Sequence, residues 1–271
     1  MSKNKWSFMT LLITTLCLTS LHLVANDFPK ILAVTEDYPP NSIILESGQF
    51  DGFLIDLTNL IFEQAQLNNQ ILVLPWVRAY KMAITKPNTL IFSIRKTKKR
   101  EKQFKWVGPV FKNGIDPWSN KNDFQITFLA LKDNNLDIEA LSDLKKFNMS
   151  STRNDALTEM LLDKYNWPKK HILQASNWEQ SIQLMLQGRA DLVAGYQGYF
   201  KLYFDENIEL AKHIKTVYKM PVPEHDYTLH YAFNFQTADK IIKQFDQARE
   251  VIMNDGRYDK LLIQWKNKLK K

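Results

Sequence analysis

Two arginines, Arg95 and Arg100, have the type and spacing that point most directly to chemistry. They follow an apolar run at residues 89–92, which predicts a short buried strand, and residues 95–105 hold seven basic side chains against one acid. Small ligands collect at the carboxyl ends of strands in open α/β sheets, and a guanidinium can hold a carboxylate through two parallel hydrogen bonds. A solvent-exposed basic loop would have the same composition. The rest of the chain is therefore needed to distinguish a ligand-binding segment from such a loop.

The sequence lacks the common patterns of enzymes and metal sites. The histidines beyond residue 25 form no metal-type cluster; they are His171, His213, His225 and His230. No serine-hydrolase elbow, phosphate-binding loop or dinucleotide fingerprint is present. Paired acids occur, but their separation in space does not follow from the sequence. We therefore expect no metal and no cofactor.

The first 25 residues predict a cleaved export signal. Lys3 and Lys5 form a basic start, an apolar stretch follows at 8–24, and Ala25 is a small residue beside the expected cut. The stretch is short for a membrane span and lacks a basic flank, which favours cleavage over an anchor. Cleavage would remove Cys17, the only cysteine, and with it any disulfide, thiol catalysis or cysteine–zinc site.

The charge balance of the exported part suits an anionic ligand. Removing the two lysines of the signal from 36 basic residues leaves 34, against 29 acidic residues. This mild positive charge fits anionic small molecules or a nearby anionic surface. Few aromatics interleave with the basic segment, and export separates the chain from nucleic acid, so no nucleic-acid partner is expected.

Apolar periodicity predicts two successive α/β sets, each with a mostly parallel sheet. The first set has strands near 30–35, 71–74 and 90–92 and helices near 53–65 and 76–84. The second has strands near 125–131, 147–150, 172–174, 191–194 and 214–218 and helices near 141–145, 156–164, 178–186 and 195–204. A proline-marked boundary at 221–226 precedes a returning strand near 227–233 and helices near 241–252 and 258–268.

Three motifs, in this order, resemble those of the family 3 periplasmic solute-binding proteins, which supply ABC transporters. They are G-F-L-I-D-L at 52–57, T-K-K-R at 97–100 and D-G-R-Y-D-K-L-L-I-Q-W at 255–265. The resemblance spans 28–268 and implies an α/β, two-lobed (type II) periplasmic binding protein fold. Two mostly parallel sheets with flanking helices are then joined by two hinge strands, and the lobes close on a ligand. The expected division is a signal peptide at 1–25, a discontinuous lobe 1 at 26–126 and 226–271, and lobe 2 at 127–225.

The resemblance also implies roles for particular residues of lobe 1. In amino-acid binders of this type, the arginine of the T-x-x-R segment holds the ligand α-carboxylate, and this role falls on Arg100. Seven and five positions earlier the family usually has a glycine and a hydroxyl residue, where this chain has Ser93 and Arg95. Tyr38 and Trp76 match places where aromatic residues usually stack on the ligand.

The expected ligand-binding set is completed by residues from lobe 2 and from one further segment. Ser151, Thr152 and Arg153 precede a helix and are expected to supply donors, and Arg78 belongs to P-W-V-R-A at 75–79, which is similar to a branch with mostly unassigned ligands. Tyr196 stands where the family often has an acid that binds the ligand amino group. Because a phenol cannot neutralise an ammonium, we expect a ligand with a carboxylate or another anionic group.

The expected function is capture of a small polar, carboxylate-bearing ligand, an amino acid or a related compound, in the periplasm. The partner would be an ABC transporter permease, and the protein would be a monomer without catalytic activity. Two alternatives stay open. A cyclohexadienyl-dehydratase-like enzyme on the same fold would need a general acid in the cleft, and a sensor protein would present its ligand to a receptor. Asp56 is expected to be structural.

Overall fold

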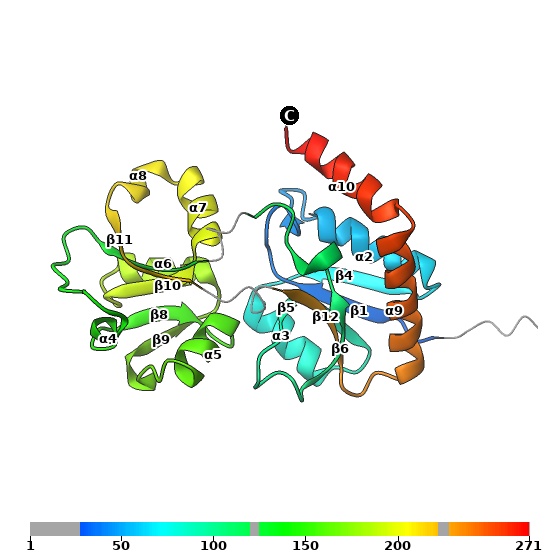
Figure 1. Cartoon of the computed structure of the whole chain (residues 1–271), viewed down its shortest axis with the longest axis horizontal. Helices are drawn as coiled ribbons and strands as arrows, with labels where there is room; N and C mark the ends of the chain where they lie inside the picture. Colours follow the sequence, from blue (N-terminus) through cyan, green and yellow to red (C-terminus); the bar gives the residue numbers. More distant parts are fainter. Residues whose placement is uncertain (1–27, 120–124, 222–227, 271) are drawn as a thin grey trace, which may run out of the picture.

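The computed structural model describes residues 28–119, 125–221 and 228–270, which form two α/β lobes side by side (Figure 1). Each lobe is built on a five-stranded sheet. The expected signal at 1–25 lies outside the described residues, as does the expected lobe boundary at 225/226. Among the helices that are described, none is long and apolar enough to cross a membrane.

Lobe 1 contains the sheet with strand order β4-β1-β5-β12-β6. Its strands are β1 (Ile31–Thr35), β4 (Asn69–Val73), β5 (Thr89–Arg95), β6 (Phe104–Pro109) and β12 (Leu229–Asn234), with a small hairpin of β2 (Ile43–Ile44) and β3 (Phe50–Asp51). Its helices are α2 (Phe53–Gln64), α3 (Trp76–Thr85), α9 (Asp239–Asn254) and α10 (Arg257–Lys268), and a short 3-10 turn, η1, spans Lys112–Gly114.

Lobe 2 contains the sheet with strand order β11-β7-β10-β8-β9. Its strands are β7 (Ile126–Leu131), β8 (Met149–Thr152), β9 (Ile172–Ala175), β10 (Leu192–Tyr196) and β11 (Ile214–Met220). Its helices are α4 (Leu141–Leu144), α5 (Ala156–Asp163), α6 (Trp178–Leu186), α7 (Gln197–Glu206) and α8 (Ile208–Ala211), and the 3-10 turn η3 spans Lys169–His171.

One strand in each sheet runs against the others. In lobe 1 it is β12, which pairs antiparallel with β5 and β6, and in lobe 2 it is β7, which pairs antiparallel with β10 and β11. These are the strands by which the chain enters lobe 2 and returns to lobe 1. The remaining pairs of the two five-stranded sheets, β1–β4, β1–β5, β8–β10 and β8–β9, are parallel, and the separate β2–β3 hairpin is antiparallel. The predicted α/β class with mostly parallel sheets is confirmed.

Apolar helix faces cover the sheets as the periodicity predicts. Ile241, Phe245 and Ile252 of α9 are buried in the core of lobe 1. In the core of lobe 2, Phe128 stacks on Trp167 with ring centroids 5.6 Å apart. Separate cores let each lobe hold its own shape while residues at their facing edges remain free to form a site.

Two strand ends differ from the sequence-based expectation in ways that matter for the site. The strand expected at 191–194 continues to Tyr196, because Gly195 and Tyr196 stay paired with Thr127 and Ile126 of β7. The strand expected at 147–150 lies instead at Met149–Thr152, where it pairs with β9. Strand β6, which was not expected, begins at the buried Phe104, near the end of the basic segment at 95–105, and continues to Pro109. The expected boundary at 126/127 falls at the first residues of β7, and the division into lobes as drawn from the sequence stays a prediction.

Candidate ligand-binding cleft

A groove of about 690 Å³ lies where the two lobes face each other. Lobe 1 contributes the end of β5 and the residues after it, and lobe 2 contributes α5 and the end of β10. The lining residues are Arg95, Lys96, Thr97, Lys98, Ala156, Glu159, Met160, Asp163, Lys164 and Tyr196. Because ligand sites favour concave surfaces between domains, this groove is the natural starting point for a site.

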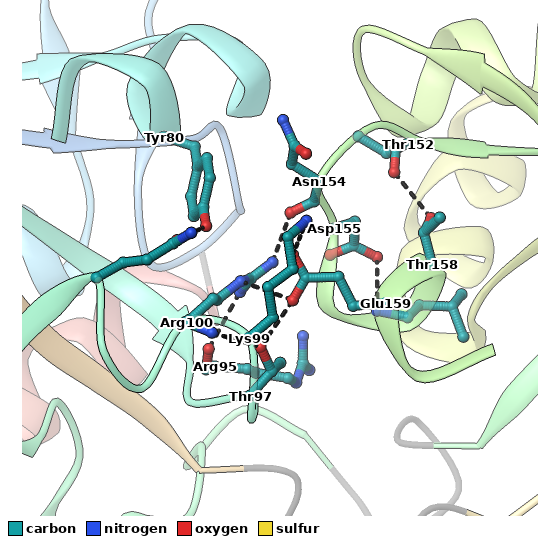
Figure 2. A network of polar contacts seen from close by, with 12 residues as sticks. Tyr80, Arg95, Thr97, Lys99, Arg100, Thr152, Asn154, Asp155, Thr158 and Glu159 are labelled. Carbon is teal, nitrogen blue, oxygen red and sulfur yellow. Dashed lines mark hydrogen bonds and ion pairs between the residues drawn. The ribbon is translucent and has the colours of Figure 1, made fainter. Parts of the chain in front are cut away.

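Arg100 lies at the contact between the lobes, in the turn that follows β5. Its side chain is only 1 % exposed. Its guanidinium donates from Nη1 to the Arg95 carbonyl at 3.1 Å and from Nη2 to the Asn154 carbonyl of lobe 2 at 2.5 Å. Its Nε lies 3.2 Å from Glu159 Oε2, also of lobe 2. Figure 2 shows these contacts converging on the guanidinium.

Glu159 is the second centre of this network, which we call the Arg100 network. It comes from the first turn of α5, and although it is a carboxylate it is only 4 % exposed. Thr97 Oγ1 donates to its Oε2 at 2.7 Å, and Lys99 Nζ lies 3.3 Å from its Oε1. Three groups of lobe 1 therefore hold one carboxylate of lobe 2, and Arg100 is already engaged by the protein itself.

Trp76 adds a further bond between the lobes. It begins α3, is 3 % exposed, and donates from Nε1 to the Asn154 carbonyl at 3.0 Å. The Arg100 guanidinium lies 5.1 Å from the Trp76 ring centroid and 5.2 Å from that of Tyr80. Trp76 thus lies buried at the contact between the lobes, outside the lining of the groove, where it packs beside Arg100 and bonds to Asn154, which has a positive φ of 57°. Its role in stacking on a ligand stays a prediction.

Arg95 ends β5 and reaches across to lobe 2. Its guanidinium carbon lies 4.0 Å from the ring centroid of Tyr196, the last residue of β10. Its Nε is buried without a hydrogen-bond partner among the described residues. The two positions singled out from the sequence, one in each lobe, therefore meet face to face through a cation–π contact.

Ser93 lies two residues earlier, at an irregularity of β5. Its φ is +62°, in the left-handed region that residues other than glycine rarely adopt. The register between β5 and β12 shifts here, between His230 and Ala232. The Ser93 side chain is 8 % exposed, and its hydroxyl has no partner among the described residues. A buried hydroxyl without a partner is uncommon in folded proteins, and this one lies two residues before Arg95, which lines the groove.

Two acidic side chains near the arginines were not anticipated from the sequence. Glu36 follows β1, and Asp155 caps the N-terminus of α5, where it accepts a bond from the Leu157 N–H at 3.2 Å. Burial and the nearby Asp155 raise the pKa of Glu36 to about 8, against the opposing pull of Arg95 and Arg100. Burial likewise raises the pKa of Asp155. At neutral pH the Glu36 carboxyl is therefore biased toward its neutral form.

Aromatic rings also connect the two lobes, next to Tyr196. Tyr38 of lobe 1 meets Tyr199 of lobe 2 edge to face, with centroids 5.1 Å apart. Tyr199 lies 5.9 Å from Tyr196 and stacks on Trp178 at 6.0 Å. The Tyr38 hydroxyl donates to Asp116 at 3.0 Å. Tyr38 thus lies at the contact between the lobes, outside the lining of the groove, and its role in stacking on a ligand stays a prediction. Tyr199, the ring it touches, carried no signal in the sequence.

The remaining expected residues lie less favourably for ligand contact. Ser151 is buried and shares a hydrogen bond of 2.5 Å with Thr158, whose hydroxyl also donates to the Thr152 carbonyl. Arg153 is exposed, with its N–H bonded to Ala175, and Arg78 is exposed on α3. Roles for Arg78, Thr152 and Arg153 stay predictions. Within the described part of the chain, no group of three or more histidine, cysteine or acidic residues could hold a metal ion.

This arrangement, two α/β lobes with charged and aromatic groups at their junction, defines a two-lobed ligand-binding protein. Solved structures share the fold over most of their length. An ancestral arginine-binding protein bound to arginine matches with a TM-score of 0.65 and 19 % identity, covering 87 % of this chain and 97 % of that one. A histidine kinase sensor domain similar to periplasmic binding proteins matches with a TM-score of 0.66 and 16 % identity. The match covers 87 % of this chain and 95 % of that one.

A third similar structure is a periplasmic binding protein of Salmonella typhimurium with high arginine specificity. It matches with a TM-score of 0.65 and 14 % identity and covers 88 % of this chain and 99 % of that one. A search of curated protein sequences finds no match. The sequence pattern of the bacterial extracellular solute-binding proteins, family 3, matches residues 31–268. The chain belongs to this family, and the resemblance seen in its motifs is confirmed.

Proposed function

We propose that the chain captures a small carboxylate-bearing solute between its two lobes and delivers it to an ABC transporter. The observation that carries this proposal is the meeting of Arg95 and Tyr196, from opposite lobes, at the wall of one groove. A guanidinium in that place can bind an anionic group from either side of the cleft. The family of extracellular solute-binding proteins gives this geometry its context.

Capture follows from the contacts between the lobes. When the lobes separate, the Arg100 network opens, and Arg95, Tyr38 and Trp76 face solvent on lobe 1. Ligand binds there first, and lobe 2 then closes with Tyr196 over Arg95. Ligand favours the closed form only by as much as it binds that form more tightly than the open one.

The two arginines take different parts in this scheme. Arg95 has an unpaired Nε and lies on the groove, so it is assigned the ligand anion. Arg100 is held by Asn154, Arg95 and Glu159, so a ligand carboxylate would have to displace Glu159 to reach it. Arg100 is therefore assigned mainly to closure, and the direct clamp inferred from family resemblance becomes its secondary role.

The setting of this activity is the periplasm, after cleavage of the N-terminal signal, with the protein acting as a monomer. Membership in a family of extracellular binding proteins supports export. A receptor is the second candidate partner in place of a permease, because one similar structure is the sensor domain of a histidine kinase. In both cases the chain presents a closed, loaded shape to a membrane protein and carries out no reaction.

A ligand screen with a structural readout tests the proposal. Purified protein is freed of bound solute by unfolding and refolding, then heated with amino acids, organic acids, polyamines and small peptides. A ligand of the folded state raises Tm by mass action, and small-angle X-ray scattering should show a more compact particle with it. Arg95→Ala should lose the shift and Lys102→Ala, an exposed basic neighbour, should keep it. Failure of every carboxylate to bind would contradict the proposal.

A further inference from the structure

Arg95 places a positive charge at the wall of the groove. None of the ion pairs among the described residues involves Arg95. Its guanidinium rests on the Tyr196 ring, and its Nε is buried and unpaired. Burial alone would lower the pKa of Arg95, but the nearby oxygens of Tyr196, Tyr199 and Asp155 raise it above its usual value. A full positive charge therefore stands in the wall of the cleft.

The carboxylates around it offer little compensation to a cationic guest. Glu159 is already bound by Arg100, Thr97 and Lys99. Asp155 is turned to the backbone of its own helix, where its oxygen accepts the Leu157 N–H. Glu36 has a carboxyl pKa of about 8, so at neutral pH it is predominantly protonated and can donate a hydrogen bond to an anion.

The groove itself has an excess of cations. Arg95, Lys96, Lys98 and Lys164 line it, against two acids, Glu159 and Asp163. One of those acids belongs to the Arg100 network. Ser93, two residues before Arg95 on β5, is more than nine-tenths buried, and its hydroxyl has no partner among the described residues. Both features suit a ligand that brings negative charge and hydrogen-bond acceptors.

We infer that the cleft selects small anions that carry a carboxylate and lack an ammonium group, and that Arg95, seated on Tyr196, sets this selectivity. An ammonium placed beside Arg95 would meet a like charge at short range in a partly desolvated site. The one groove-lining acid outside the Arg100 network, Asp163, is exposed to solvent, where its attraction for a cation is screened. The Arg95 guanidinium of the protein takes the position over Tyr196 that the ammonium group of an amino-acid ligand would otherwise occupy. This inference rests on the proposed function, because it concerns the ligand of the same cleft.

Matched ligand pairs that differ only in the α-ammonium test the inference. The pairs are succinate and aspartate, glutarate and glutamate, propionate and alanine, and 3-phenylpropionate and phenylalanine. Isothermal titration with the refolded full-length mature protein should give, for at least one pair, binding of the member without ammonium about tenfold tighter or more, which corresponds to about 1.4 kcal/mol. Binding of the amine-bearing members as tightly as their partners, or more tightly, would overturn the inference and leave the proposed function standing.

Variants of the two central residues sharpen the test. Arg95→Ser should weaken the preferred anion by about tenfold or more, Arg95→Lys should retain part of the binding, and Tyr196→Asp should shift the preference toward amine-bearing ligands. Lys102→Ser removes one positive charge from the same segment outside the groove lining and should change nothing. Equal losses in Arg95→Ser and Lys102→Ser would overturn the role of Arg95. If no member of any pair binds, the inference is overturned, and the proposed function fails with it only if the wider screen also finds no carboxylate ligand.

Discussion

Arg100 and Glu159 form an ion pair across the cleft. Both side chains are almost fully buried, with 1 % of the Arg100 side chain and 5 % of the Glu159 side chain exposed. Because they belong to different lobes, separating the lobes returns both charges to water. Burying two charges costs solvation free energy, which the surrounding bonds from Thr97 and to Asn154 help to offset. The pair therefore acts on the balance between open and closed forms more than on the folding of either lobe.

Glu159→Gln should shift the ligand-free protein toward the open form. The substitution leaves Arg100 with a buried charge and no anionic partner, which should cost the closed form about 1–3 kcal/mol while opening relieves the loss. Small-angle X-ray scattering should show a larger radius of gyration, with little change in Tm. Glu101→Gln is the control, because Glu101 pairs with Lys96 at the surface of lobe 1. Identical scattering from Glu159→Gln and the parent would refute this reading.

Trp76→Phe should weaken ligand binding without unfolding lobe 1. It keeps an aromatic ring beside Arg100 but removes the Nε1 donor to the Asn154 carbonyl, a bond between the lobes. The loss of one such bond should cost about 0.5–1.5 kcal/mol, or roughly a twofold to tenfold weaker Kd. Trp106→Phe is the matched control, since Trp106 donates to Glu101 within lobe 1. If both variants bind equally well, the bond to Asn154 does not contribute to closure.

Glu36→Gln should flatten the dependence of stability on pH. The Glu36 carboxyl keeps its proton up to about pH 8 in the folded protein, whereas in the unfolded chain it loses it near its ordinary value of 4.5. Between these values the unfolded chain binds fewer protons, so rising pH lowers the free energy of unfolding. Tm measured across that window should fall less steeply in Glu36→Gln than in the parent, while Glu101→Gln keeps the parental slope. A slope unchanged by Glu36→Gln would show that another group dominates.

Asp56→Ala should destabilise lobe 1 and leave ligand binding intact. Asp56 accepts a hydrogen bond from Trp265 Nε1 at 2.8 Å, which joins α2 to α10 away from the groove. Its loss should cost about 1–2 kcal/mol, visible in urea unfolding. Trp265→Phe removes the donor of the same hydrogen bond. The double variant should therefore lose less free energy of unfolding than the sum of the two single variants. Fully additive losses, or an altered Kd in Asp56→Ala, would contradict a purely structural role.

Most of the fold could be predicted because each lobe repeats a local pattern. The apolar faces of α2 and α9 and the short buried strands are properties of neighbouring residues, and the confirmed α/β class follows from their alternation. Strand ends were harder to place, as Tyr196 shows. Its membership in β10 depends on a partner, Ile126, that lies 70 positions earlier in the chain.

Arg95 was predicted from its place after a strand, and Tyr196 from the family resemblance. Arg95 and Tyr196 were both singled out, and the structure brings them together. Glu159 was missed because an acid in the first turn of a helix is ordinary, and its burial against Arg100 exists only once the lobes meet. Tyr199 was missed because its contact with Tyr38, a residue of the other lobe, exists only when the two lobes meet. A contact between the two lobes does not appear in the apolar periodicity of the sequence, which reports only how each helix or strand packs within its own lobe.

The interior position of β12 in the sheet of lobe 1 imposes an order of assembly along the chain. β12 sits between β5 and β6, which precede it by more than a hundred residues, while lobe 2 is one continuous stretch. Lobe 2 can complete its sheet as soon as β11 is available, whereas β5 and β6 present unpaired edges until residues 229–234 arrive. The second lobe should therefore mature first, and the first lobe should be the slower and more aggregation-prone half during biogenesis.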